Sequence, residues 1–281
     1  MLGCVTADGP ILSARSARVR DARQLTVGKY RRARSQFLAE GPQAVREALG
    51  AGAAVEVFVD EPWMERRHEV VTAALALGIP VHVVEEIGFA GLVSAQTPQG
   101  VVAVCTWEPS TLAALAAVEG PGQVVLAHEI SDPGNAGALI RVADAAGALG
   151  VALSERSVDP TNPKCVRATA GSLFHLPVVA AGATSDAIEA LRAADFRILA
   201  ADVTPDSVDL FTAEQDGLLG GRIAWVFGNE AHGLPADVLG SVDHVVRIPI
   251  LGRAESLNLA TAAAVCLYAK ARLTGLGQSA P

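Results

Sequence analysis

The chain has 281 residues, enough for two domains that each bury a core of ordinary size. No apolar stretch reaches the about 18 uncharged residues that a membrane span requires, and residues 1–15 lack the pattern of a signal peptide. The four cysteines are scattered without metal-ligand spacing, which favours reduced thiols in a cytoplasmic protein and gives no support to a metal site.

The net charge of −8 conceals a local imbalance. Between Arg15 and Arg34 lie eight basic residues and one acid, so this segment carries +7 and the rest of the chain carries −15. One interpretation is a solvated helical face. The other is contact with nucleic-acid phosphate, which a basic segment on an acidic body favours. We expect residues 1–34 to form a basic arm that is mobile until a partner binds, with RNA contacts from Arg18, Arg20, Arg23, Arg31 and Arg32.

Residues 35–106 alternate helical and strand patterns, which is typical of a small α/β module. We expect helices and strands, in chain order, at residues 42–49, 55–59, 70–77, 79–84 and 101–105. Four Pro and Gly residues then punctuate residues 107–122. We therefore expect a linker at 107–120 between two domains.

Residues 121–281 are expected to form the second domain. Continuous apolar runs alternate there with helical stretches, at residues 124–127, 151–153, 198–203, 223–227 and 245–250. Such runs predict a mostly parallel sheet covered on both faces. The apolar stretch 257–269 is too short to span a membrane and predicts a buried helix.

A first polar motif follows the strand expected at 124–127. This motif begins with residues that favour a turn, Asp132-Pro133-Gly134-Asn135, and Asn135 is a favourable N-cap for the helix expected after it. A cap does not explain Arg141, which lies in an otherwise apolar helical stretch. An arginine in that position must find an anion or the surface.

Two further motifs follow later strands. Gly228-Asn229-Glu230 is a turn after the strand expected at 223–227, and a solvent-facing loop glutamate is its plain structural alternative. Ser256-Leu257-Asn258 follows Ile248-Pro249, and a helix capped by Ser256 accounts for that pattern structurally.

A fourth, weaker motif spans residues 159–172. Lys164 and Arg167 lie one helical turn apart within it. They predict RNA phosphate contacts, although ordinary surface charges are an equal alternative.

Together these motifs resemble the conserved motifs of the SpoU (TrmH-like) branch of the SPOUT family, whose members methylate the ribose 2′-hydroxyl of RNA with S-adenosylmethionine. Residues 37–42 and 98–103 more loosely resemble the family's L30e-like substrate-binding domain. The resemblance implies an α/β protein with a C-terminal SPOUT parallel sheet and a deep trefoil knot. It also implies a homodimer with the active site at the interface. Pattern alone predicts an ordinary doubly wound sheet, because true knots are exceptional.

The resemblance also implies roles for individual residues. Arg141 corresponds to the residue with the central catalytic part. The other residues expected at the reaction site are Asn135, Glu230, Ser256 and Asn258. The residues expected to bind the cofactor are Gly228, Ile248 and Leu257. Because an arginine guanidinium stays protonated in proteins, we expect Arg141 to hold phosphate and stabilise the developing alkoxide rather than to act as a base.

The sequence therefore predicts an S-adenosylmethionine-dependent RNA 2′-O-methyltransferase acting in the cytoplasm without a metal. Ribosomal RNA, and 23S RNA in particular, is the favoured substrate. A tRNA methyltransferase and a catalytically silent RNA-binding or ribosome-assembly factor are the alternatives. A dehydrogenase is disfavoured because no Gly-x-Gly-x-x-Gly turn is present, and a serine hydrolase because no Gly-x-Ser-x-Gly elbow is present.

Overall fold

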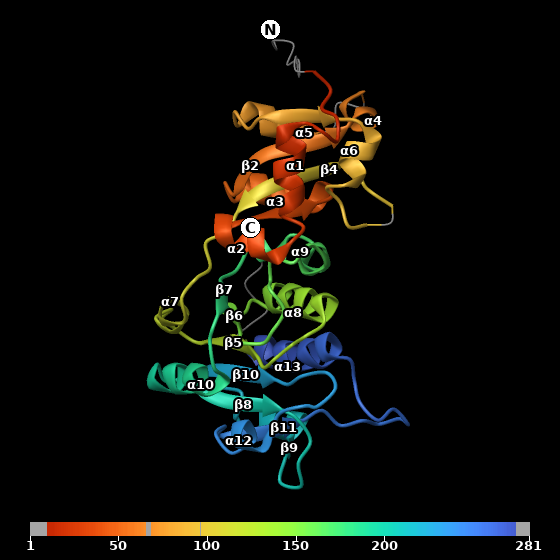
Figure 1. The fold of residues 1–281 in the computed structure, drawn as a ribbon. Helices are drawn as coiled ribbons and strands as arrows, with labels where there is room; N and C mark the ends of the chain where they lie inside the picture. Colours follow the sequence, from red (N-terminus) through yellow and green to blue (C-terminus); the bar gives the residue numbers. More distant parts are fainter. Residues whose placement is uncertain (1–9, 66–68, 96, 274–281) are drawn as a thin grey trace. The chain divides into compact units, whose positions relative to one another are not determined.

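The computed structural model describes residues 10–65, 69–95 and 97–273 (Figure 1). Contacts between residues divide the chain into two compact units. The first holds Met1–Glu108 together with Asp159–His175, and the second holds Pro109–Val158 and Leu176–Pro281. The chain therefore crosses between the units three times, and a segment from the C-terminal half belongs to the N-terminal unit.

The first unit contains a four-stranded sheet in the order β1-β4-β2-β3. Its strands are β1 (Gln36–Glu40), β2 (Ala54–Asp60), β3 (Val81–Val84) and β4 (Val101–Thr106). β1 and β2 flank β4 in antiparallel pairs, and β3 is parallel to β2. The helices between the strands are α3 (Pro42–Gly50), α4 (Glu61–Glu65), α5 (Glu69–Ala76) and α6 (Glu86–Ala90). The small α/β module expected from the sequence is present.

The expectation of a mobile basic arm is wrong for the described part of residues 1–34. This part forms α1 (Ala17–Gln24) and α2 (Gly28–Arg34). Val19 and Ala22 are three residues apart on one face of α1, and both are buried in a cluster with Phe58 of β2. Burial of that apolar face against the sheet is what orders the segment, while most of its charges stay on the outside. Residues 1–9, which belong to the expected arm and include Cys4, lie outside the described residues.

The segment Asp159–His175 contributes α9 (Pro163–Thr169) and a 3₁₀ turn (Ser172–Phe174) to the first unit. Phe174 stacks on Phe37 of β1, with ring centroids 5.8 Å apart. Arg31, only 5% exposed, joins Asp159 in an ion pair with 2.8 Å between Nη2 and Oδ2. Arg31 Nε also donates to Thr161 Oγ1 at 3.1 Å.

The Asp159 carboxylate is the electrostatic centre of this contact. Burial raises its pKa, but hydrogen bonds from Thr161 and Arg31 outweigh that effect and hold the pKa below its ordinary value. The ionised carboxylate is therefore the form that the folded unit prefers, and it fastens the segment to α2.

The second unit is built on a seven-stranded sheet in the order β7-β6-β5-β10-β8-β11-β9, and every neighbouring pair is parallel. Its strands are β5 (Gly122–Ala127), β6 (Gly150–Leu153), β7 (Val178–Ala180), β8 (Arg197–Ala201), β9 (Val208–Asp209), β10 (Arg222–Phe227) and β11 (His244–Arg247). The predicted parallel sheet is confirmed. β11 ends before Pro249, a residue that has no N–H to donate to a strand ladder.

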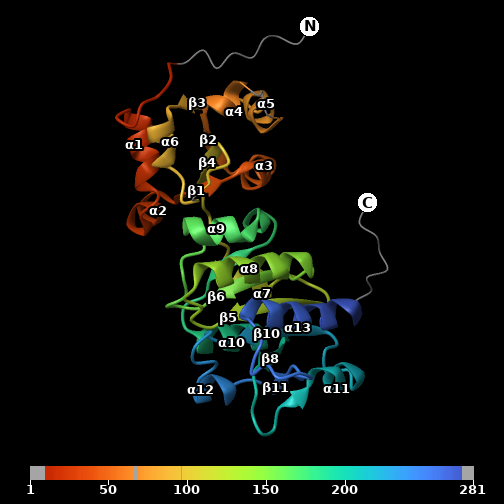
Figure 2. The same ribbon diagram turned by 90° about the vertical axis from the view of Figure 1, so that its right-hand side faces the viewer.

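Helices cover both faces of this sheet (Figure 2). They are α7 (Leu112–Ala116), α8 (Pro133–Ala145), α10 (Thr184–Ala193), α11 (Leu210–Gln215), α12 (Ala236–Leu239) and α13 (Leu259–Leu273). On one face, α7 and α10 bury Leu115 and Leu191 against alternate residues of the central strands. On the other, α8 and α13 pack side by side. Among the described helices, none is long and apolar enough to cross a bilayer.

Candidate active site

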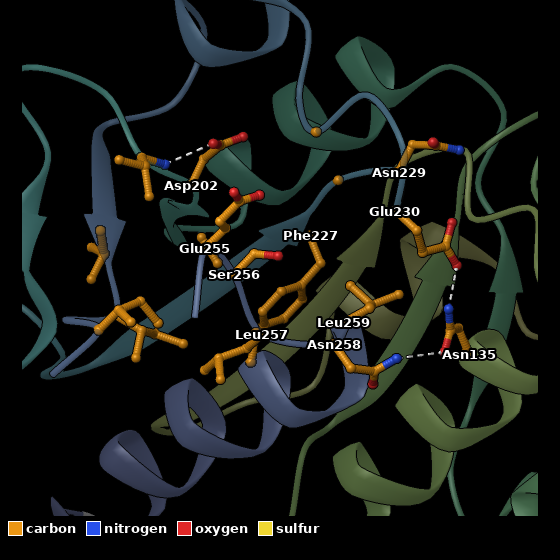
Figure 3. A pocket seen from close by; sticks show the side chains of 18 residues that line it. Asn135, Asp202, Phe227, Asn229, Glu230, Glu255, Ser256, Leu257, Asn258 and Leu259 are labelled. Carbon is orange, nitrogen blue, oxygen red and sulfur yellow. Dashed lines mark hydrogen bonds between the residues drawn. The ribbon is translucent and has the colours of Figure 1, made fainter. Parts of the chain in front are cut away.

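A cavity of about 440 Å³ lies in the second unit at the carboxyl ends of β8, β10 and β11 (Figure 3). Open parallel sheets bind their ligands at this edge. Seven of the eight residues expected for catalysis and cofactor binding line it, namely Asn135, Gly228, Glu230, Ile248, Ser256, Leu257 and Asn258. The fold thus brings the first three sequence motifs to a single place.

The polar wall of the cavity is a chain of three side chains from the three motifs. Asn258 Nδ2 donates to Asn135 Oδ1, and Asn135 Nδ2 donates to Glu230 Oε1, both at 3.0 Å (Figure 3). A carboxylate only accepts hydrogen bonds, so Glu230 fixes which end of the Asn135 amide is the donor. Each amide retains a second N–H that can donate to a ligand.

The first motif reaches this wall because Asp132, not Asn135, caps α8. Asp132 Oδ1 accepts the backbone N–H of Asn135 at 2.8 Å, and the helix begins at Pro133. The prediction of Asn135 as the N-cap is therefore wrong. Proline is favoured at the first helical position, which places the cap one residue before it. The Asn135 amide therefore does not cap the helix and instead contributes to the cavity wall.

The third motif also differs from its predicted capping pattern. α13 begins at Leu259, and Asn258 Oδ1 accepts the backbone N–H of Ala260 at 2.9 Å in the manner of an N-cap. Asn258 thus holds the helix terminus with its oxygen and Asn135 with its nitrogen. Ser256 and Leu257 lie in the preceding loop, exposed along the cavity, and the prediction of Ser256 as the cap is wrong.

Gly228 in the second motif meets a steric requirement of its own loop. A Cβ atom there would lie 2.5 Å from the carbonyl carbon of Gly233 and 2.8 Å from the nitrogen of Leu234. Asn229 and Gly233 close this loop by exchanging two backbone hydrogen bonds, of 3.1 and 2.8 Å. Only a residue without a side chain lets the loop fold back in this way beside the cavity.

Arg141 is the expected catalytic residue that the structure does not bring to the cavity. It lies on α8 six residues after Asn135, so the two side chains point about 120° apart around the helix. Its side chain is exposed, and it makes no hydrogen bond or ion pair within the described part of the chain. Arg141 is therefore an exposed cation on the same helix as Asn135.

Sequence reasoning missed three features of the site. Asp202, at the end of β8, lines the cavity and accepts the backbone N–H groups of Val203 and Leu234 at 2.7 and 3.1 Å. Glu255 lines it from the loop before α13. Asn229 donates from Nδ2 to the carbonyl oxygen of Glu129 at 2.7 Å, which fixes the second motif to the first. Asp202 could have been predicted as a cavity residue, because it directly follows an apolar strand.

The backbone of Glu129, which accepts the Asn229 hydrogen bond, is itself held in place by neighbouring residues. Glu129 and Arg156 are both in the left-handed backbone region, with φ of 50° and 64°, and their side chains form an ion pair. The Ser154 hydroxyl oxygen accepts the backbone N–H of Glu129 at 2.9 Å. Non-glycine residues in this conformation cost about 1 kcal/mol or more each and cluster at functional sites. The loops that carry the first two motifs are therefore held in a defined shape.

The residues expected to contact RNA all belong to the first unit. Arg18, Arg20, Arg23 and Arg32 are exposed on α1 and α2, and Lys164 and Arg167 lie on α9. Arg167 is within 3.4 Å of Glu40 and also donates to Ser94. Arg31 is buried against Asp159, so its predicted role in RNA contact is wrong, since its donors are used inside the unit.

Comparison with protein families gives two matches. The profile of the SpoU rRNA Methylase family matches residues 122–268, and that of the MRM3-like substrate binding domain matches residues 16–103. Among curated proteins, the chain is 34% identical over 265 residues to the 23S rRNA (guanosine(2553)-2'-O)-methyltransferase RlmP of Bacillus subtilis. That match covers 92% of this chain and 97% of the relative.

Solved structures agree. The AdoMet-bound rRNA methyltransferase from Sinorhizobium meliloti is 34% identical with a TM-score of 0.78, and the match covers 94% of this chain and 99% of that one. The SpoU methyltransferase AviRb from Streptomyces viridochromogenes, in complex with AdoMet, is 29% identical with a TM-score of 0.78, covering 94% and 100%. The cavity and its three motif loops lie within the region that the first profile matches, and the chain belongs to the SpoU rRNA methylase family.

Proposed function

We propose that the protein transfers a methyl group from S-adenosylmethionine to a ribose 2′-hydroxyl of RNA, with 23S ribosomal RNA as the favoured substrate. The observation that carries this proposal is the convergence of three distant motifs on one cavity, joined by the hydrogen bonds Asn258–Asn135–Glu230. The similarity to proteins named as 23S rRNA 2′-O-methyltransferases supports the choice of substrate.

The cavity suits an adenosine-bearing cofactor. Its apolar side chains include Phe227, Ile248, Leu257 and Leu259, which offer contacts to a purine ring, and its polar side chains offer partners to ribose and amino-acid groups. We assign the cofactor-binding role to Gly228, Ile248 and Leu257. When bound, S-adenosylmethionine supplies an electrophilic methyl group on a positively charged sulfur.

The protein's own part is positioning and electrostatic stabilisation. Asn135, held by Glu230 and Asn258, lines the cavity with an amide that retains one N–H, and Ser256 lines the cavity with a hydroxyl. These groups would orient the ribose so that its 2′-oxygen lies in line with the methyl group. Arg141 would grip a neighbouring phosphate and stabilise the negative charge that develops on that oxygen.

Because Arg141 lies outside the cavity of its own chain, we place it in the active site of a partner protomer in a homodimer. Exposed apolar side chains on α13 and on the loop before it support such an interface: Leu251 is 93% exposed, Leu257 36% and Tyr268 44%. A trefoil knot is supported by the path of α13. β11 lies near one edge of the sheet, separated from β5 by β8 and β10, and α13 follows it in the chain. α13 returns to β5, where Gln123 Nε2 donates to the carbonyl oxygen of Leu267 at 3.1 Å.

The first unit would bind the RNA around the modified nucleotide. Six exposed or partly exposed cations carry this assignment: Arg18, Arg20, Arg23, Arg32, Lys164 and Arg167. The match of residues 16–103 to a substrate-binding domain profile supports it. We place the reaction in the cytoplasm, in keeping with the buried thiols of Cys105 and Cys266, which form no disulfide within the described part of the chain.

The test is transfer of labelled methyl from S-adenosylmethionine to total ribosomal RNA and, separately, to total transfer RNA, followed by mapping of alkali-resistant ribose sites. One resistant site in 23S RNA is the expected result. A methylated site in tRNA would show that the substrate is tRNA and would still support ribose 2′-O-methylation as the reaction. Cofactor binding without transfer to either pool would favour a silent RNA-binding factor on the same scaffold.

A further inference from the structure

The charges that line the cavity are all of one sign. Asp202, Glu230 and Glu255 are the ionisable residues among the described lining, and no lysine, arginine or histidine joins them. Carboxylates are ionised at neutral pH, so the wall carries three negative charges. If the cavity bound the phosphates of RNA directly, basic side chains would be expected among the residues that line it.

These charges are not neutralised by neighbours. Within the described ranges, no ion pair joins Asp202, Glu230 or Glu255 to a basic side chain. Asp202 accepts two backbone N–H groups and Glu230 accepts one amide, contacts that hold the carboxylates in place without removing their charge. The Glu255 side chain is exposed at the cavity and has no hydrogen bond there.

A partly enclosed cavity with uncompensated carboxylates concentrates negative potential and attracts a cation. The cofactor assigned above and its demethylated product differ by one methyl group and one positive charge, since the sulfonium becomes a neutral thioether. The adenosine and amino-acid parts of the two molecules are identical. Contacts to those parts therefore cannot distinguish them, whereas the charge of the wall can.

We propose that Asp202 and Glu255 make the cavity selective for the sulfonium form of the cofactor over the thioether product. The inference rests on the proposed function and deepens it. Loss of the positive charge on methyl transfer would weaken the attraction to the wall and favour release of the product. The same wall repels RNA phosphate, so the substrate backbone would be held by cations that the cavity lining of one chain does not supply, such as Arg141 of the partner subunit.

The experiment measures the binding of three ligands to the full-length protein by calorimetry. They are S-adenosylmethionine, S-adenosylhomocysteine, and sinefungin, in which an ammonium group stands where the methylated sulfonium would be. The two charged ligands should bind about tenfold more tightly than the thioether, and raising the salt concentration should reduce that ratio. The variant Glu255→Gln should lower the ratio about threefold, chiefly by weakening the charged ligands.

Glu189→Gln is the matched control, because Glu189 is an exposed acid of α10 in the same unit, outside the cavity. This variant should leave the ratio unchanged. Asp202→Asn should also lower the ratio, but Glu255→Gln is decisive, since no hydrogen bond is lost with it.

Equal binding of charged and neutral ligands by the wild type, or a ratio unaltered by both cavity variants, would overturn the inference. In either case normal methyl transfer to RNA would leave the proposed function intact. Failure of the wild type to bind S-adenosylmethionine at all would instead overturn the proposed function, and the inference with it.

Discussion

The side-chain amide of Asn135 donates to the carboxylate of Glu230 at 3.0 Å, although the two residues are 95 positions apart in the chain. Asn135 lies in the first turn of α8 and Glu230 in the loop after β10, so their contact depends on the parallel pairing of β5 with β10. The amide is thereby given one orientation before any ligand enters.

Replacing Asn135 should therefore impair the chemical step. For Asn135→Ala we expect kcat to fall about ten- to a hundredfold, since a preorganised donor is lost, with little change in cofactor affinity. The near-isosteric Asn135→Asp should not rescue activity, because it sets a second carboxylate against Glu230. Single-turnover methyl transfer together with calorimetry separates the two quantities. Thr261→Ala, on the exposed side of α13, is the control; a wild-type rate for Asn135→Ala would remove this residue from the mechanism.

Arg141→Ala should abolish more than 99% of the activity, a loss of about 3 kcal/mol in transition-state stabilisation, while cofactor binding persists. Because the active site is assigned to two protomers, mixing Arg141→Ala with Asn135→Ala should restore part of the activity. One of the two sites in a mixed dimer would then have both wild-type residues. No recovery in mixtures shown by mass spectrometry to exchange subunits would place Arg141 and Asn135 in the same site of one protomer.

Gly228→Ala should disrupt the loop of the second motif. The added methyl group would meet backbone atoms of Gly233 and Leu234 rather than a flexible side chain, so the loop must open. We expect cofactor affinity to fall at least about tenfold, at a cost in stability of about 1 to 3 kcal/mol. Gly252→Ala is the matched control, because a Cβ atom there meets nothing within 4 Å. Equal cofactor affinities for the two variants would show that the loop tolerates the methyl group.

Arg31→Met should destabilise the first unit by about 2 to 4 kcal/mol, because it leaves the largely buried Asp159 carboxylate without its partner. The folded-state pKa of Asp159 is lowered, so the contact stabilises the unit above the unfolded carboxyl value of about 3.9 and is lost as pH falls through the folded value. Urea unfolding from pH 7 to pH 3 should show the wild type converging on the variant. A constant difference across that range would exclude Asp159 as the titrating partner. Exposed Arg20→Met is the control.

Much of this fold and site follows from sequence pattern. Continuous apolar runs predicted five of the seven strands of the parallel sheet, because strands buried on both faces have no reason to alternate. The two short edge strands, β7 and β9, were not predicted. Seven of the residues that line the cavity were predicted, because they belong to motifs that follow such runs and resemble those of the SpoU family. Asn135 as a cap was mispredicted because two residues, Asp132 and Asn135, suited that role, and only the start of the helix at Pro133 decides between them.

Long-range burial could not be predicted in the same way. The charge pattern of residues 15–34 hides the buried face of α1, whose three-residue apolar spacing is short and lies among arginines. Arg31 resembles its exposed neighbours in sequence and is distinguished only by Asp159, which lies 128 residues away. The location of Arg141 outside the cavity likewise depends on helix phase relative to a pocket built from other elements.

Because the chain passes three times between the two units, neither unit can be obtained as one continuous segment of the sequence without losing part of it. This limits where the gene can be cut in the laboratory and where it can recombine in evolution. A gene fragment that begins at Pro109 would still encode Asp159–His175, but not the sheet against which α9 packs. Cys165, Val166 and Leu173, buried in the intact chain, would then face water and promote aggregation. The N-terminal unit cannot be exchanged by one recombination event at residue 108; a functional chimera must inherit the Asp159–His175 insert from the same parent.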